Sequence, residues 1–163
     1  MLNHSILCKK LGELCLQKQI HIALAESCTG GLVAANITDI AGSSQWFLGG
    51  AVVYSNAAKI NLLGVDTKII EQFGAVSPET AIAMAQGALQ KFQSDIALSI
   101  TGIAGPDGGT KDKPVGTVCF ALSDTNGVKS KIHYFTGDRA SIREQACEFA
   151  LEWMCNHLTS VKV

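Results

Sequence analysis

Residues 25–31, Ala-Glu-Ser-Cys-Thr-Gly-Gly, lie between an apolar run at 20–25 and a helical pattern that begins at Leu32. Where a strand turns into a helix, the first N–H groups of the helix have no intrahelical partner, and with the helix dipole they favour a phosphate, a carboxylate or a developing oxyanion. We expect Ser27 to lie in that field. A plainer interpretation is that Thr29 caps the helix and the glycines relieve crowding.

Three further segments place polar or glycine-rich chemistry at predicted strand ends, where ligands bind in open α/β sheets. Lys59 lies about one helical turn beyond the start of Tyr-Ser-Asn at 54–56. The glycines of 101–109 let backbone N–H groups turn toward an anion or a carbonyl oxygen, although the segment is not a P-loop. Arg139 and Arg143, one turn apart, could clamp a phosphate. More plainly, the lysine and the arginines could be solvated side chains and the glycine-rich segment an ordinary wide turn. Taken together, however, the three segments predict one pocket.

Short apolar runs alternate with helical patterns along the chain, which is typical of an α/β layered domain. We predict strands over 20–25, 47–54, 95–101, 115–122 and 128–135. We predict helices around 7–15, over 32–40, after a Ser55 cap, over 78–92 after a Ser77 cap, and through the apolar stripe of 142–154.

Length and charge narrow the class of protein. The 163 residues suit one domain, and 13 Lys plus Arg against 14 Asp plus Glu give a net charge of −1, so nothing indicates nucleic acid or an anionic membrane. We expect a small-molecule ligand. No apolar run approaches a membrane span, and the segment 1–5 lacks a signal-peptide pattern, so we expect a cytoplasmic protein. A homo-oligomer is compatible with the sequence, but the 47% apolar fraction is no basis for predicting an interface.

The cysteines and histidines show no metal-site spacing. The six cysteines are scattered without a Cys-x-x-Cys pair, so we expect reduced thiols, four of them at helical face spacing in the core, namely Cys8, Cys15, Cys147 and Cys155. No two histidines stand at i, i+3 or i+4. We therefore expect neither a metal nor a cofactor.

Several motifs together resemble the C-terminal domain family of the competence-damage-inducible protein CinA. They are Ala-Glu-Ser-Cys-Thr-Gly-Gly at 25–31, Tyr-Ser-Asn-x-x-Lys at 54–59, Gly-Ala-Val-Ser at 74–77, Thr-Gly-Ile-Ala-Gly-Pro-Asp-Gly-Gly at 101–109, Pro-Val-Gly-Thr-Val at 114–118 and Gly-Asp-Arg at 137–139. The resemblance implies a bacterial protein with a three-layer α/β/α sandwich, a mixed, mostly parallel sheet, and a single domain over 1–163.

The resemblance also implies an activity. Stand-alone members of the family are nicotinamide-nucleotide amidohydrolases, which convert nicotinamide mononucleotide and water to nicotinate mononucleotide and ammonia in pyridine-nucleotide recycling. Longer relatives carry an N-terminal domain linked to ADP-ribose pyrophosphatase activity. We do not expect that domain here, so the second activity is not carried over.

Amide hydrolysis needs a nucleophile, a base and donors for an oxyanion. We expect Ser27 as nucleophile and Lys59 as base, with Tyr54 relaying the proton or orienting the amine. There is no Gly-x-Ser-x-Gly elbow and no evident His-Asp pair, which argues against a Ser-His-Asp triad. For the oxyanion and the substrate we expect groups from the turn, the glycine-rich loop and the last helix: Cys28, Thr29, Gly30, Gly31, Thr101, Gly102, Ala104, Gly105 and Arg139. Glu26 and Thr101 are expected to order the site.

Alternatives stay open at this point. Cys28 is a rival nucleophile, because a thiol at a helix N-terminus can have a depressed pKa. Side chains alternate along extended backbone, so only one of Ser27 and Cys28 should face the cleft. The domain could also be a regulatory module that binds a nucleotide or small anion without turning it over, or an amidase for another small amide.

Overall fold

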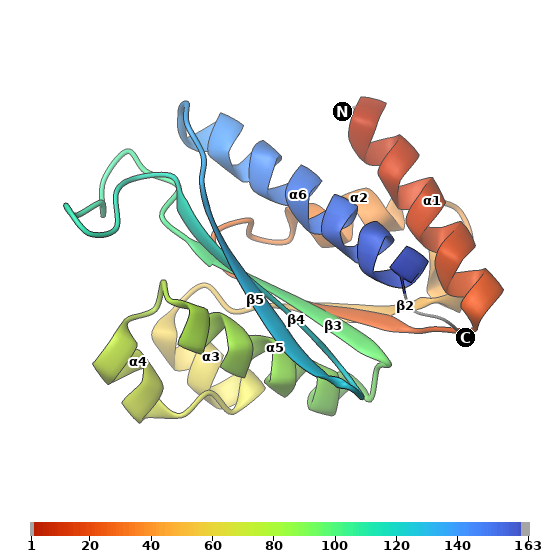
Figure 1. The fold of residues 1–163 in the computed structure, drawn as a ribbon, viewed down its shortest axis with the longest axis horizontal. Helices are drawn as coiled ribbons and strands as arrows, with labels where there is room; N and C mark the ends of the chain where they lie inside the picture. Colours follow the sequence, from red (N-terminus) through yellow and green to blue (C-terminus); the bar gives the residue numbers. More distant parts are fainter. Residues whose placement is uncertain (1, 161–163) are drawn as a thin grey trace.

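The computed structural model describes residues 2–160, so Met1 and residues 161–163 of the predicted single domain lie outside the described part (Figure 1). The strands are β1 Ile22–Glu26, β2 Phe47–Val52, β3 Ile96–Gly102, β4 Thr117–Asp124 and β5 Gly127–Tyr134. The α-helices are α1 Leu2–Lys18, α2 Leu32–Thr38, α3 Asn56–Leu63, α4 Thr67–Phe73, α5 Pro78–Phe92 and α6 Arg139–Ser160, and a 3₁₀ turn covers Ser43–Gln45.

The five strands form one mixed sheet in the order β2-β1-β3-β4-β5. β1 pairs in parallel with β2 and β3, β4 runs antiparallel to β3, and β5 runs antiparallel to β4. Four strands therefore point the same way and only β4 is reversed. The predicted mixed, mostly parallel sheet is confirmed. The chain leaves β1 on one side for β2 and returns on the other side for β3, so the carboxyl end of β1 is a topological switch point.

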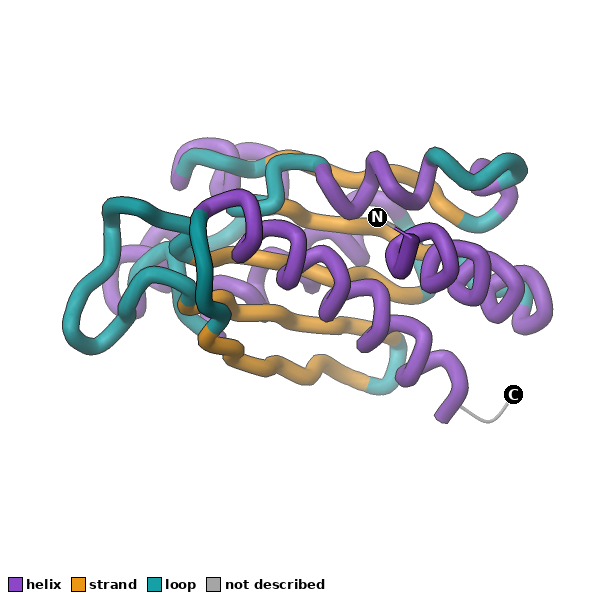
Figure 2. Tube along the Cα trace, turned by 90° about the horizontal axis from the view of Figure 1, so that it is seen from above, coloured by secondary structure: helices purple, strands orange, loops and turns teal. Residues whose placement is uncertain are grey.

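Helices cover both faces of the sheet and complete the predicted α/β/α layers. α1, α2 and α6 lie on one face, and α3, α4 and α5 lie on the other (Figure 1). Seen from above, α6 runs over the strands beside α1, and long loops gather at one end of the sheet (Figure 2). One of these loops, residues 103–116, continues from the carboxyl end of β3.

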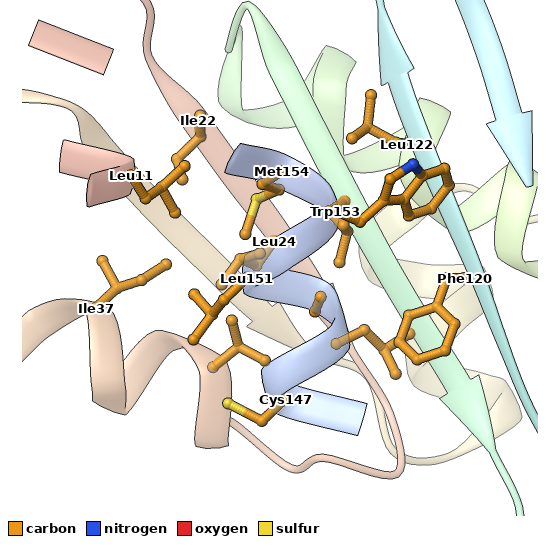
Figure 3. Packing of buried hydrophobic residues seen from close by; sticks show 14 of the residues in the cluster. Leu11, Ile22, Leu24, Ile37, Phe120, Leu122, Cys147, Leu151, Trp153 and Met154 are labelled. Carbon is orange, nitrogen blue, oxygen red and sulfur yellow. The ribbon is translucent and has the colours of Figure 1, made fainter. Parts of the chain in front are cut away.

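The alternation of side chains along β1 separates two cores. Ile22 and Leu24 pack with α1, α2 and α6, whereas Ala23 and Ala25 pack toward α5. Figure 3 shows the first core, in which Cys147, Leu151 and Met154 of α6 lie among residues of β1 and α2. Cys8, Cys15, Cys147 and Cys155 are all free thiols buried in this core, as predicted.

The local signals gave most elements within a few residues of their bounds. Ser55 and Ser77 cap α3 and α5, accepting hydrogen bonds from the N–H groups of Ala58 and Thr80. α4 was not predicted, because it has only seven residues and none of them is fully buried, although Ile70 packs partly buried against the core. None of the helices in the described part of the chain is both long and apolar enough to cross a membrane.

Candidate active site

The segment after β1 forms a tight turn that carries Ser27. The Ser27 N–H donates to the carbonyl of Ile100 on β3 at 2.9 Å, which extends the parallel pairing by one residue. The Gly30 N–H then donates back to the Ser27 carbonyl at 3.0 Å. Gly30 and Gly31 adopt φ values of 59° and 95°, which only glycine reaches without strain. The glycine pair thus lets the chain reverse into α2 directly behind Ser27.

Glu26 caps α2 from the end of β1. Its carboxylate, on a residue only 1% exposed, accepts hydrogen bonds from the N–H groups of Gly31, Val33 and Ala34 at 3.0, 3.2 and 2.9 Å. The Glu26 carboxylate therefore occupies the anion-binding position at this helix N-terminus that we expected to be open to a ligand. The Gly30 and Gly31 N–H groups are both occupied and are not the free donors that we predicted.

Thr29 does not cap the helix. Its hydroxyl is fully buried and has no hydrogen-bond partner among residues 2–160. The N-cap position is Gly31, which has no side chain to offer. Glu26 therefore supplies the capping function that the plainer interpretation assigned to Thr29, and it also orders the turn, in agreement with the role we expected for Glu26.

The side chains of Lys59 and Ser27 are in contact on the face of the sheet that α3 covers, opposite α2 and α6. The distance between Lys59 Nζ and Ser27 Oγ is 3.1 Å, and the two residues are 1% and 7% exposed. Nζ also donates to the backbone carbonyls of Val53 and Tyr54 at 3.0 and 3.2 Å. Within the described residues, no carboxylate forms an ion pair with this amine.

The environment of Lys59 favours the neutral amine. Burial lowers the pKa of Lys59 from its ordinary value of 10.5, because a desolvated ammonium loses its hydration. A neutral amine has two N–H donors and one lone pair. The carbonyls of Val53 and Tyr54 can only accept, so they take the two N–H groups and leave the lone pair for the Ser27 hydroxyl. This arrangement can remove the proton from Ser27.

Cys28 points away from this pair. Its side chain is 6% exposed and belongs to the core beneath α6, with Sγ close to Gly102. Burial raises the pKa of the Cys28 thiol to about 12, which outweighs the opposite effects of its own N–H, Arg143 and Lys59. Such a thiol is almost entirely protonated near neutral pH and is a weak nucleophile. The alternation of side chains thus turns Ser27 rather than Cys28 toward Lys59.

Of the two roles expected for Tyr54, orienting the Lys59 amine and relaying the proton, the structure shows a contact only for the first, and that contact comes from the backbone. The Tyr54 carbonyl holds Lys59, but the side chain is 60% exposed and the hydroxyl accepts a hydrogen bond from Arg139 Nη2 at 2.9 Å. A proton relay through the hydroxyl is therefore not supported by any hydrogen bond to Lys59. Arg139 also donates through Nη1 to the Gly105 carbonyl at 2.7 Å. Arg139 thus joins the segment after β2 to the loop 103–116.

The beginning of the glycine-rich loop is structural. Thr101 Oγ1 donates to the carbonyl of Ala75 at 2.7 Å, so Thr101 orders the turn before α5 and not Ser27 itself. A Cβ on Gly102 would lie 2.8 to 3.1 Å from β4 atoms and Cys28 Sγ, so this position needs glycine. Ala104 is buried, at 5% exposure. In this loop Gly105 has its carbonyl committed to Arg139.

The two arginines at the start of α6 do not form one clamp. Arg143 donates through Nε and Nη2 to the carbonyls of Cys28 and Thr29 at 3.1 and 2.9 Å. Arg139 faces Tyr54 and Gly105 instead. Only Arg139 remains exposed, as a phosphate ligand must be. The spacing of four residues between Arg139 and Arg143 did not indicate that the two side chains contact different segments.

A cavity of about 310 Å³ lies away from these groups, around the β4–β5 turn and the end of α6. Its lining includes Asp124, Lys129 and His157, and neither Ser27 nor Lys59. The His157 ring and the Asp124 carboxylate are hydrogen-bonded at 2.9 Å, a pair that ties α6 to β4. The reactive pair, and not this hollow, marks the candidate active site.

Solved structures of similar fold are CinA superfamily proteins. A competence-damaged (CinA) superfamily protein from Klebsiella pneumoniae superposes with a TM-score of 0.93 at 32% identity, covering 97% of this chain and 99% of that one. A competence/damage inducible protein from Agrobacterium tumefaciens gives a TM-score of 0.92 at 41% identity, covering 97% and 96% of the two chains.

Curated relatives are longer than this chain. A CinA-like protein of Geotalea uraniireducens is 55% identical over 141 residues, which are 86% of this chain and 34% of that protein. A CinA-like protein of Geobacter sulfurreducens is 53% identical over 142 residues, again 34% of its length. The chain thus spans about a third of these relatives. The sequence pattern of the family described as CinA C-terminal domain matches residues 4–158, and the chain belongs to this family.

Proposed function

We propose that this domain is a nicotinamide-nucleotide amidohydrolase that works in the bacterial cytoplasm in pyridine-nucleotide recycling. The observation that carries the proposal is the buried Lys59 amine, 3.1 Å from Ser27 Oγ and free of any ion pair in the described residues. The substrate, nicotinamide mononucleotide, follows from the resemblance of the chain to stand-alone members of its family. A module that only binds nucleotides has no need to desolvate a lysine beside a serine.

The geometry suggests the following sequence of steps. Neutral Lys59 takes the proton of Ser27 as Oγ attacks the carboxamide carbon, and the carbonyl oxygen becomes an oxyanion. The Lys59 ammonium then gives its proton to the amide nitrogen, and the C–N bond breaks. The nitrogen leaves as ammonia, and the acyl group stays on Ser27 Oγ as an ester. Water, deprotonated by Lys59, attacks the ester and releases nicotinate mononucleotide, and the proton returns to Ser27.

Arg139 is our candidate for the phosphate of the substrate. Its guanidinium is exposed at the rim, between Tyr54 and Gly105, where it is a fixed cation with further N–H donors to offer. A phosphate that took these donors would bind at the rim while the carboxamide approached Ser27.

Ammonia release by the purified protein tests the proposal. Nicotinamide mononucleotide is compared with nicotinamide, which lacks the ribose phosphate, and with NAD, in which that phosphate is joined to a second nucleotide through a pyrophosphate bond. We expect release from the mononucleotide in preference to both. Equal release from free nicotinamide would indicate an amidase for another small amide. Tight binding of the mononucleotide by calorimetry without any release would support the regulatory binding module instead.

A further inference from the structure

The guanidinium of Arg143 holds the carbonyl side of the turn that carries Ser27. Nε donates to the Cys28 carbonyl at 3.1 Å and Nη2 to the Thr29 carbonyl at 2.9 Å. The planar fork of an arginine matches two successive carbonyls in a way that a lysine cannot. Arg143 belongs to α6, which lies on the face of the sheet opposite α3 (Figure 1).

The orientation of one peptide group follows from this contact. A trans peptide points its C=O and its N–H in opposite directions. Among residues 2–160 the one cis bond is Gly105–Pro106, so the Cys28–Thr29 peptide is trans. Because the Cys28 carbonyl faces Arg143, the Thr29 N–H points away from α6. That is the side on which Ser27 Oγ meets Lys59 of α3.

The two glycine N–H groups of the turn are occupied. Gly30 donates to the Ser27 carbonyl, and Gly31 donates to Glu26. The Cys28 N–H lies beside its own sulfur, where it favours the thiolate. The Thr29 N–H has no acceptor among the described residues, although Thr29 is fully buried. Buried backbone N–H groups are nearly always paired, so this donor is a candidate for a partner that arrives with the substrate.

We propose that Arg143 is a positioning residue that directs the Thr29 N–H at the oxyanion formed on Ser27. The proposal rests on the amidase activity proposed above. It makes Arg143 part of the support of the nucleophile turn and not part of a phosphate site. Glu26 holds the following N–H groups of the same turn, so a carboxylate and a guanidinium fix it from two directions.

Kinetics of Arg143 variants separate the two roles. In Arg143→Met we expect kcat to fall by about 100-fold, the usual loss for one oxyanion donor, with little change in KM. Arg143→Lys should fall between the parent and the Met variant, because an ammonium can hold one of the two carbonyls. Lys91→Met removes an exposed cation of α5 as the matched control and should keep the parent rate.

The substrate pair used is nicotinamide mononucleotide and nicotinamide riboside, which carries the same carboxamide without the phosphate. Positioning predicts the same fold-loss in kcat on both. A loss confined to the mononucleotide, or expressed in KM, would overturn the proposal and make Arg143 a phosphate ligand. An unchanged kcat in a folded Arg143→Met protein would also overturn it.

Hydrogen exchange at the amides of residues 28–31 gives a readout that does not depend on activity. We expect faster exchange in Arg143→Met and no change in Lys91→Met. Unchanged exchange in Arg143→Met would show that Arg143 does not hold the turn, and the proposal would fail. If the parent releases no ammonia at all, the amidase proposal and the oxyanion role fail together, while the exchange still decides whether Arg143 holds the turn.

Discussion

Replacing Lys59 by Met tests the buried neutral amine through protein stability, without any substrate. Lys59 is 1% exposed, and burial lowers its pKa from 10.5. Between its folded pKa and 10.5, the folded protein holds a neutral amine whereas the unfolded chain binds a proton. The unfolded state thus binds one more proton in this window, so a rise in pH stabilises the parent but not the Met variant.

The expected size of this effect follows from proton linkage. Within the window, the free energy of unfolding of the parent should gain about 1.4 kcal/mol per pH unit relative to Lys59→Met. Below the folded pKa and above 10.5 the difference should be flat, because both states then have the same protonation. A constant offset is also expected. In the variant both carbonyls that Lys59 contacts lose their donor. The buried Val53 carbonyl then costs about 1–3 kcal/mol, whereas the carbonyl of the exposed Tyr54 can bind water instead.

Urea unfolding of both proteins at intervals from pH 6 to 11 gives the measurement. Lys91→Met, which removes an exposed lysine of α5, is the control and should track the parent at every pH. A difference between parent and Lys59→Met that stays constant over the whole range would refute the reasoning, since it would mean that Lys59 titrates alike in the folded and unfolded states.

Three more predictions concern the groups around the pair. Glu26→Gln should lower the free energy of unfolding by about 1–3 kcal/mol in urea, because an uncharged amide replaces the carboxylate that accepts three N–H bonds; an unchanged midpoint would contradict this. Iodoacetamide at pH 8 should leave Cys28 unmodified in the native protein by peptide mass spectrometry, because its thiol is buried with a pKa of about 12; rapid labelling at Cys28 would count against the assignment of Ser27. Tyr54→Phe should raise KM more than it lowers kcat in steady-state kinetics, because it removes the bond to Arg139 but keeps the carbonyl that holds Lys59; a fall in kcat alone would restore the relay role of the hydroxyl.

The placement of Ser27 and Cys28 on opposite faces could be predicted from sequence. Extended backbone alternates, and the apolar residues of β1 already show which positions face which core. The Ser55 cap sets the start of α3, and one further turn brings Lys59 to the end of β1. Local rules therefore sufficed for the reactive pair.

The contacts that support the pair could not be predicted in this way. Glu26 caps a helix that begins six residues later, which is possible only because the turn between them folds back. Arg139 and Arg143 share one helix face at a spacing typical of a clamp, yet they contact different segments. Both facts depend on where α6 lies relative to the sheet, and no local signal contains that position.

We propose that Ser27, activated by Lys59, attacks a carboxamide. The most direct measurement is ammonia release from nicotinamide mononucleotide by the matched variants Ser27→Ala and Cys28→Ala, with binding of the mononucleotide followed in parallel. We predict that Ser27→Ala binds but loses turnover by about a million-fold, below detection, while Cys28→Ala retains it. Retained release in Ser27→Ala, or loss confined to a folded Cys28→Ala, would show that Ser27 is not the nucleophile.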